Sequence, residues 1–266
     1  MRYFAFSTLL VITIILLVKG TAGKRPTKIV GGGYAKIEDF PFMVALENGY
    51  TWQTCGAMLI SPRHALTAAH CVVNGREEND PYRYELRWYN IVSGDSNRQN
   101  VDTVQVHKVV RLDVHKSFIG YPPPFVGDIA VITLDEPIKI GPTRRPAGLP
   151  SRRYGRGEHG VILGWGWTQP ENGVSQRDLK KAPMTIDRDI DGYKFEGIER
   201  EGIAFCNGDS GGPFYINGEV YGIISHSIDC TGNTPGVFTN VYDYKDWIEQ
   251  IVQGLHPSES AELRVK

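Results

Sequence analysis

The sequence has little cysteine, and its other absences also narrow the kinds of protein it can encode. Its 266 residues include four cysteines, and none of them forms the C-x-x-C spacing typical of a zinc site. It contains no Asn-x-Ser/Thr sequence for N-glycosylation. After residue 18, no apolar run is long enough to cross a membrane. These absences argue against a zinc-knuckle protein and against a protein with several membrane spans.

Positive charge is scarce once the N-terminal segment is set aside. The chain has 29 basic and 30 acidic residues, but residues 1–28 contain five of the basic and none of the acidic residues. The remainder therefore carries a net charge of −6. A mildly acidic body without a basic cluster offers no attraction for a phosphate backbone, so we expect no nucleic-acid partner.

The one long apolar run lies at the N-terminus. Arg2 precedes the run FAFSTLLVITIILLV at residues 4–18, and the small residues of KGTAG follow it. This order is typical of a secretory signal peptide, so we expect residues 1–23 to be removed and the protein to be secreted, with no membrane association afterwards. An uncleaved membrane anchor is the alternative, although the run is short for a span.

Secretion changes how the cysteines are interpreted. An even number of cysteines in an exported chain favours disulfides over metal ligation, and four cysteines allow three pairings. No metal or cofactor site is expected. The cysteines are Cys55, Cys71, Cys206 and Cys230.

The local patterns indicate an all-β fold that ends in a helix. The 30 glycines and 16 prolines separate short runs rich in Val, Ile and Tyr. Residues 242–252 instead repeat apolar residues at three- and four-residue spacing, which predicts an amphipathic helix. Many strands and one late helix indicate barrels or a sandwich, with a linker at about residues 135–146. The polar segment 258–266 is expected to fray.

Three motifs carry residues suited to nucleophilic catalysis. LTAAHC places His70 beside Cys71, where a disulfide would fix the backbone next to a base. GDIAVITL places Asp128 before an apolar strand, where its carboxylate can accept a hydrogen bond from an imidazole. CNGDSGGP places Ser210 among glycines. Taken singly, these residues can also be a strand-end histidine, a turn aspartate and part of a glycine turn.

The glycines around Ser210 have a chemical use. A serine hydroxyl is weakly nucleophilic until a base removes its proton, and the resulting oxyanion needs hydrogen-bond donors. The backbone N–H groups of Gly208 and Ser210 can converge on one point, because Gly208 tolerates a positive φ. Gly211 and Gly212 leave space for a substrate chain.

The order of six motifs resembles that of the chymotrypsin-like serine proteases, the family of trypsin, chymotrypsin and elastase. IVGG, LTAAHC, GDIAVITL, GWG, CNGDSGGP and PGVFTNV follow one another between Ile29 and Val252. The resemblance implies two six-stranded antiparallel β-barrels with a C-terminal helix, formed by residues 29–266, and an active site between the barrels.

The same resemblance implies roles for individual residues. His70 resembles the general base, Asp128 the orienting acid and Ser210 the nucleophile, with oxyanion donors at Gly208 and Ser210. It also implies disulfides between Cys55 and Cys71 and between Cys206 and Cys230. The expected activity is a serine endopeptidase acting on proteins or peptides, with protein protease inhibitors as further partners. A non-catalytic relative that binds proteins is the rival interpretation, but such relatives normally lose one of the three residues.

The resemblance also locates a specificity pocket, at Ala204, Ser227 and Gly236. Ala204 stands where trypsin-like members have aspartate, so we expect cleavage after apolar residues. Large side chains would fit a deep pocket, and Ala or Val would be preferred if Phe205 fills it. Asp229, near the pocket mouth, is interpreted as a solvated loop charge.

The segment TKIVGG resembles the family's activation site. Residues 24–28 would form an activation peptide, and cleavage after Lys28 would free the α-amine of Ile29 to pair with Asp209. Because an apolar pocket handles lysine poorly, a trypsin-like protease is expected to make this cut.

Overall fold

The computed structural model describes residues 29, 32–49, 53–73, 86–120, 125–168, 176–198, 202–255 and 260–263. The expected signal peptide at 1–23 and the expected activation peptide at 24–28 lie outside these residues. In the described part of the chain, no helix combines the length and apolar character that a membrane span requires.

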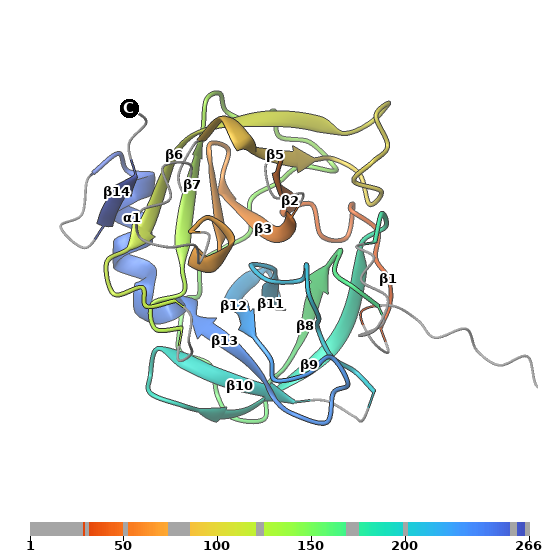
Figure 1. The fold of residues 1–266 in the computed structure, drawn as a ribbon, viewed down its shortest axis with the longest axis vertical. Helices are drawn as coiled ribbons and strands as arrows, with labels where there is room; N and C mark the ends of the chain where they lie inside the picture. Colours follow the sequence, from red (N-terminus) through yellow and green to blue (C-terminus); the bar gives the residue numbers. More distant parts are fainter. Residues whose placement is uncertain are drawn as a thin grey trace, which may run out of the picture.

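The N-terminal half forms a closed antiparallel barrel of six strands in the order β6-β5-β2-β3-β4-β7 (Figure 1). The β6–β7 pairing completes the ring. The strands are β2 (Met43–Asn48), β3 (Gln53–Ser61), β4 (His64–Thr67), β5 (Tyr89–Ser93), β6 (Gln105–His115) and β7 (Ala130–Leu134).

The C-terminal half forms a second closed barrel in the order β9-β10-β13-β12-β11-β8, completed by the β8–β9 pairing. The predicted pair of six-stranded antiparallel barrels is confirmed. Residues 135–158 connect the barrels. The strands are β8 (His159–Gly164), β9 (Lys180–Asp189), β10 (Lys194–Ile198), β11 (Pro213–Ile216), β12 (Glu219–His226) and β13 (Gly236–Asn240).

The C-terminal helix joins the two barrels. The 3-10 turn η3 (Val241–Tyr244) follows β13 and leads into α1 (Lys245–Val252), and the Asn240 side chain accepts a hydrogen bond from the Tyr242 N–H at its start. The apolar face of α1 packs into the core of the first barrel through Trp247, Ile248 and Ile251. The predicted C-terminal helix is therefore confirmed.

Each barrel carries one additional short strand. β1 (Gly33–Tyr34) pairs with β9. β14 (Ser260–Leu263) pairs with β6 at Leu112–His115, beside α1 (Figure 1). The expectation that the C-terminal segment frays is wrong for residues 260–263, because their backbone pairs with the outer part of β6.

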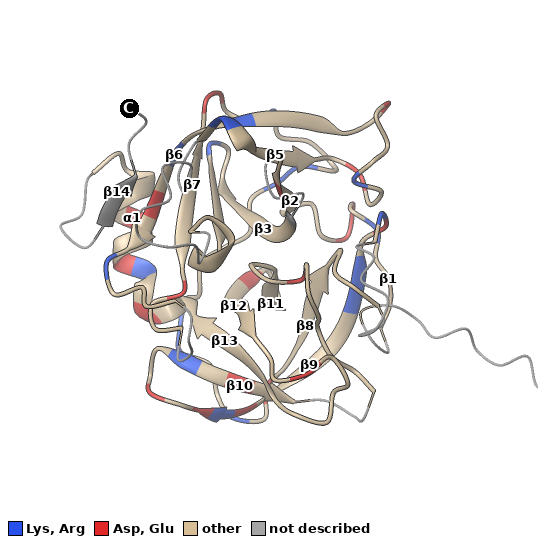
Figure 2. Cartoon of the chain, in the orientation of Figure 1, with Lys and Arg blue, Asp and Glu red and all other residues tan. Residues whose placement is uncertain are grey.

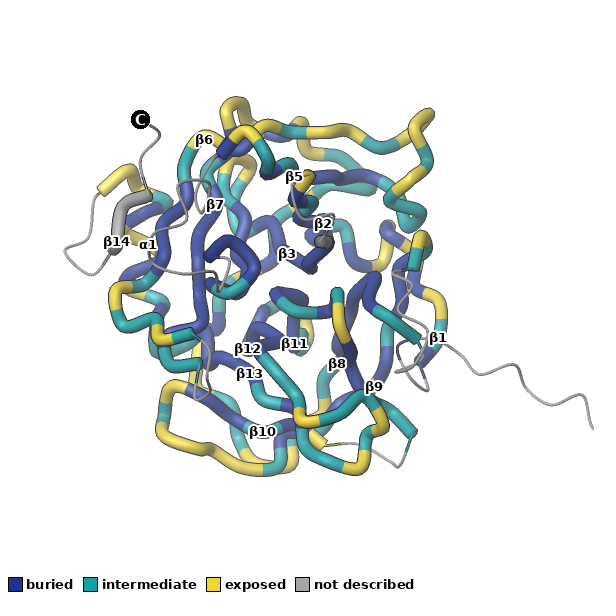
Figure 3. The backbone as a smooth tube through the Cα atoms, in the orientation of Figure 1, coloured by how far each residue is buried: buried dark blue, intermediate teal, exposed yellow. Residues whose placement is uncertain are grey.

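Apolar residues gather in two clusters that meet between the barrels. The larger cluster fills the first barrel and includes Leu163, Trp165 and Ile223 from the second half of the chain. The smaller cluster fills the second barrel. Figure 3 shows buried backbone where the barrels face each other, and Figure 2 shows basic and acidic residues interspersed over both halves. The seam between the barrels is thus largely buried.

Candidate active site

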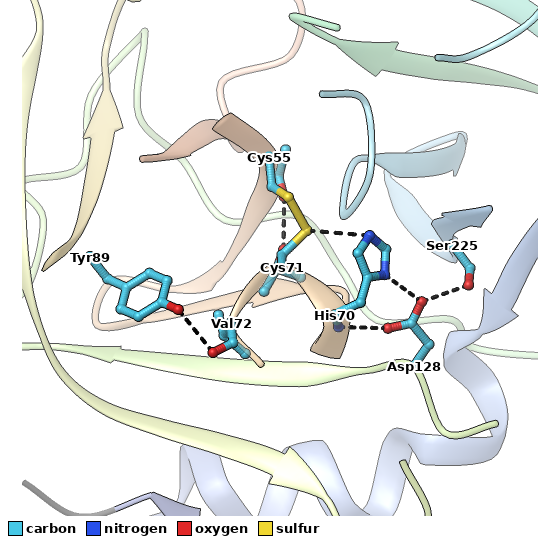
Figure 4. The surroundings of a disulfide bond; sticks show 9 residues. Cys55, His70, Cys71, Val72, Tyr89, Asp128 and Ser225 are labelled. Atoms are coloured by element: carbon cyan, nitrogen blue, oxygen red, sulfur yellow. Dashed lines mark hydrogen bonds and ion pairs between the residues drawn. A yellow bond between two sulfur atoms is a disulfide. The ribbon is translucent and has the colours of Figure 1, made fainter. Parts of the chain in front are cut away.

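His70 lies at the seam, on the 3-10 turn η1 (Ala69–Cys71) that follows β4. The neighbouring Cys71 forms a disulfide with Cys55 of β3 (Figure 4). The bridge ties η1 to the barrel wall directly beside the imidazole. Because Cys55 and Cys71 share a disulfide, their sulfur atoms offer no thiolate with which His70 could form a metal site.

Asp128 holds the other side of the imidazole. It is fully buried just before β7, and its Oδ2 lies 2.8 Å from His70 Nδ1. Its Oδ1 accepts a hydrogen bond of 2.9 Å from the His70 backbone N–H, and the Ser225 hydroxyl donates to Oδ2 at 2.6 Å (Figure 4). One carboxylate therefore fixes both the backbone and the ring of His70.

The pair shifts the pKa of each partner. Burial alone would raise the pKa of Asp128, but the nearby His70 and the hydrogen bonds from His70 and Ser225 lower it. Burial alone would lower the pKa of His70, but the charge and hydrogen bond of Asp128 raise it. Asp128 thus remains an acceptor, which directs the His70 Nδ1 proton toward itself and leaves Nε2 as the basic nitrogen.

Ser210 reaches the seam on a turn of the second barrel that packs tightly against the first. The Gly56 N–H of β3 donates to the Ser210 carbonyl at 2.8 Å. A Cβ at Gly211, where φ is +78°, would lie 2.3 Å from both Gly56 O and Thr67 Oγ1. A Cβ at Gly56 would lie 2.7 Å from Gly212 Cα. The glycines therefore allow the serine turn to approach the strands that carry His70.

Ser210 and His70 line one cleft of about 340 Å³ at this seam. No hydrogen bond joins them in the described part of the structure, and His70 Nε2 lies 3.8 Å from Cys71 Sγ. In many enzymes this bond shortens only when substrate occupies the site. The cleft is lined by His70, Phe125, Phe205, Cys206, Asn207, Ser210, Ser225, His226, Ser227, Ile228, Asp229 and Cys230.

The backbone before Ser210 turns at a glycine with a positive φ. Gly208 has a φ of +92°, in the region that glycine adopts without strain. Neither the Gly208 nor the Ser210 N–H donates to another group among the described residues. Cys206 forms a disulfide with Cys230, which ties the start of this turn to the opposite wall of the cleft. Both N–H groups are thus available to an incoming ligand.

Asp209 lies behind the turn and is completely buried. Its carboxylate accepts hydrogen bonds from Gly166 N–H at 2.8 Å and from Cys206 N–H at 3.0 Å. A Cβ at Gly164 would lie 2.1 Å from Asp209 Oδ1, and one at Gly166 would lie 2.4 Å from its Cγ. The GWG motif therefore provides a space shaped for this carboxylate. Burial raises the pKa of Asp209 to about 7, although the two backbone hydrogen bonds oppose the shift.

The residues of the expected specificity pocket lie together, but the space between them is small. Ala204, Ser227 and Gly236 line a cavity of about 10 Å³, which is about the room of a single water molecule. The Phe205 ring lies directly against Gly236, since a Cβ at Gly236 would lie 2.2 Å from its Cε1. Phe205 is 4% exposed and packs edge-on against Phe238. Phe205, one of the residues that line the pocket, thus takes up the space beside Gly236.

Asp229 lies at the edge of the larger cleft rather than in this pocket. Its carboxylate accepts hydrogen bonds from the Thr231 N–H and hydroxyl at 2.9 and 2.7 Å. These hydrogen bonds lower the pKa of Asp229. The carboxylate is therefore ionised and already engaged within its own loop.

Two residues of the site, Ser225 and Phe125, have no motif by which the sequence identifies them. Ser225 reaches Asp128, Phe125 lies beside His70, and His226 closes the wall next to both. A usable signal for Ser225 is its position near the end of an apolar strand run, where β12 ends. The signal for Phe125 was an aromatic residue three positions before Asp128.

Comparison with known proteins identifies the family to which the chain is similar. The trypsin family profile matches residues 29–248. Trypsin of Saccharopolyspora erythraea is 32% identical over 240 residues, which cover 85% of this chain and 99% of that protein. Serine protease 1 of Rattus norvegicus is 30% identical, with 90% of this chain and 97% of that protein covered.

A solved structure supports the same conclusion. Neuropsin, a serine protease expressed in the limbic system of mouse brain, superposes with a TM-score of 0.71 at 26% identity, over 83% of this chain and 98% of that one. With the two closed barrels, the C-terminal helix and the family match over most of its length, the chain belongs to the trypsin family and is a serine endopeptidase with the chymotrypsin fold.

Proposed function

We propose that His70, Asp128 and Ser210 are the catalytic residues of this endopeptidase. The observation that carries the proposal is the His70–Asp128 pair, held by three hydrogen bonds to the carboxylate, in the cleft that Ser210 also lines. His70 Nε2 removes the Ser210 proton as the hydroxyl attacks the peptide carbonyl, and Asp128 stabilises the imidazolium that forms. The same imidazolium then protonates the leaving amine.

The oxyanion is assigned to the backbone donors of the serine turn. The N–H groups of Gly208 and Ser210 are unengaged among the described residues, and each donor of this kind accounts for about 10²–10³-fold in kcat. A water molecule, activated by His70, hydrolyses the acyl-enzyme. The substrate class is a protein or peptide chain lying along the cleft.

A covalent serine-directed inhibitor tests this assignment. After activation, the inhibitor should label one residue, and sequencing the labelled peptide should identify Ser210. Labelling should require His70, so the His70→Ala variant should react far more slowly. An unlabelled protein that still binds peptides would favour the non-catalytic interpretation instead.

We propose that the enzyme cleaves after small apolar residues, such as Ala or Val. Ala204 provides no charge for Arg or Lys, and the Phe205 ring leaves about 10 Å³ of free space. Asp229 lies outside this pocket and is engaged by Thr231, so it does not replace the missing charge. Both features select against long and basic side chains.

Shortening Phe205 should enlarge this pocket. In Phe205→Ala, kcat/KM for substrates with Leu or Phe before the scissile bond should rise about 10- to 100-fold relative to Ala substrates, since a pocket discriminates by about 1–3 kcal/mol per methylene. The ratio within one variant is the readout, because losing a buried ring also costs stability, about 3–5 kcal/mol. Peptide-mixture profiling with active-site titration measures it.

The matched control for charge is Asp229→Asn. This variant should leave the order of preference unchanged. If wild-type enzyme cleaves after Arg or Lys faster than after Ala or Leu, and Asp229→Asn removes that preference, the pocket assignment is wrong.

We further propose that the protein is secreted as an inactive precursor and activated by cleavage after Lys28. Secretion is supported by the apolar N-terminal run and by two disulfides. At the expected cleavage site, Ile29 is 1% exposed, and its φ of 44° is a strained conformation for a β-branched residue. Asp209 is a buried carboxylate, and no cation among the described residues lowers its pKa, so it can accept the new ammonium group as a partner. The activating partner is a trypsin-like protease, and protein inhibitors would bind the cleft as substrates do.

A further inference from the structure

A second histidine is connected to the buried carboxylate of the site. The Ser225 hydroxyl oxygen lies 2.6 Å from Asp128 Oδ2 and 3.1 Å from His226 Nδ1. Ser225 is 3% exposed, and His226 is half-buried in the wall of the cleft. Two imidazoles therefore converge on Asp128, one directly and the other through a hydroxyl group.

The direction of these hydrogen bonds follows from their chemistry. An ionised carboxylate can only accept hydrogen bonds, so the single hydroxyl proton of Ser225 is donated to Asp128. The Ser225 oxygen is then an acceptor toward His226, whose Nδ1 must carry the proton. The chain of donation runs from His226 to Ser225 and from Ser225 to Asp128, which also accepts from His70.

The imidazole of His226 is held in place from its other face. The Phe125 ring lies 4.9 Å from the His226 ring, at an interplanar angle of 35°, and 5.8 Å from the His70 ring. Phe125 has a φ of 46°, a backbone conformation that non-glycine residues seldom adopt and that is often found at functional sites. Phe125 thus packs against both imidazoles.

Three charged or titratable groups act electrostatically on His226: Asp128 from the turn before β7, Lys194 from β10 and His70 from η1. Burial lowers the pKa of His226, Asp128 opposes the shift, and Lys194 and His70 add to it. At neutral pH the ring is therefore uncharged and has one proton to donate.

We propose that His226 is a positioning residue of the catalytic pair, which fixes the Ser225 hydroxyl on Asp128 by donating its Nδ1 proton to the Ser225 oxygen. The inference rests on the proposed roles of His70, Asp128 and Ser210. Without this donor, the Ser225 hydroxyl turns away from Asp128 for part of the time. Asp128 then loses part of a hydrogen bond that stabilises its charge, and its attraction for the protonated His70 increases.

The variant that removes the donor and keeps a flat ring against Phe125 is His226→Phe. In it the pKa of His70 should rise by about 0.5 pH unit, as a weakened hydrogen bond to the facing carboxylate would cause. On the acid side of the pH profile, kcat/KM of His226→Phe should be about threefold lower than that of the wild type, because a pKa raised by about 0.5 leaves about one third as much neutral His70. In His226→Asn the side-chain amide N–H takes the place of Nδ1–H, so both values should return close to those of the wild type.

The matched control is His107→Phe. His107 also lies beside a serine, with its Nε2 2.8 Å from Ser93 Oγ, but it is on β6 and none of its contacts reaches Asp128. This variant should leave the His70 pKa unchanged.

Two measurements separate this inference from the proposed function. Side-chain NMR titration of the histidines gives the His70 pKa in a Ser210→Ala background, where no activity is needed and autolysis is avoided. The pH profile of kcat/KM is measured in the activated enzyme. A raised His70 pKa in His226→Phe, restored in His226→Asn, supports the inference even if no variant hydrolyses peptides, in which case the proposed function alone fails. An unchanged His70 pKa in His226→Phe overturns the inference, whether or not KM changes. His226 is then only part of the cleft wall.

Discussion

Ser210→Ala should lower kcat for peptide hydrolysis by about 10⁶-fold, the scale on which removing the nucleophile of a serine protease acts. The hydroxyl is the atom that forms the acyl-enzyme, and water attacking directly retains only the help of the oxyanion donors and of substrate binding. KM should change little, because Ser210 keeps its backbone N–H and its carbonyl still accepts from Gly56. Hydrolysis of a peptide substrate by protein activated with immobilised trypsin, then freed of it, measures the loss.

Ser227→Ala is the matched control, since Ser227 lines the same cleft and loses the same hydroxyl. It should retain activity within about tenfold of the wild type, because it alters a pocket wall by one polar atom. Thermal unfolding of both variants should remain close to that of the wild type. Activity of Ser210→Ala equal to that of Ser227→Ala would remove Ser210 from the role of nucleophile.

Much of this fold was predictable because its motifs are local. Strand runs such as those of β7 and β12 are apolar on both sides of the chain, which indicated barrels or a sandwich, and the resemblance to the chymotrypsin-like proteases implied the two barrels. β9 gave a weaker signal, because its buried residues Ala182, Met184 and Ile186 alternate with Pro183 and Thr185, and proline is rare inside strands. Lys180 lies on the same buried face at the start of β9, where the strand pattern predicts an apolar residue.

What the sequence could not provide were contacts between distant segments. The pairing of β14 with β6 depends on backbone groups at a sheet edge, for which polar side chains give no signal. Phe205 could be placed beside the pocket, but whether its ring fills the pocket depends on the space above Gly236 and against Phe238. The reach of Ser225 to Asp128 spans 97 positions, so it required the fold itself.

The activation proposal depends on a buried carboxylate that has no cationic partner among the described residues. Asp209 is fully buried, and burial raises its pKa to about 7. A carboxyl whose folded pKa lies above its reference of 3.8 takes up a proton on folding. The free energy of unfolding of the uncleaved chain should therefore fall as pH rises from about 4 to about 7. Asp209→Asn should show a smaller fall in urea unfolding over the same range.

Cleavage after Lys28 should remove the destabilisation caused by the buried Asp209 charge, and it should activate the catalytic site. The new α-amine of Ile29 has a reference pKa of about 7.7–8.0, and pairing with Asp209 raises it. The pairing therefore stabilises the cleaved enzyme fully below that reference, and the stabilisation is lost as pH rises through the folded value. Activity of the cleaved enzyme should decline in alkali although His70 stays neutral there. Asp209→Asn cannot form the ion pair, so after cleavage it should lose about 10²–10³-fold in kcat, as when the Gly208 N–H donor is removed.

The precursor should not perform this cut on itself. Its pocket contains Ala204 and the Phe205 ring, and neither offers a charge or the space that Lys28 requires. Pure precursor incubated alone should remain inactive, whereas trypsin should yield the N-terminus IVGG together with activity. Lys28→Gln is the control, because trypsin should no longer activate it while the folded domain is unchanged. If the wild-type precursor alone produced IVGG and activity as fast as with trypsin, an external activator would be unnecessary, and the pocket would have to accept lysine despite the Phe205 ring.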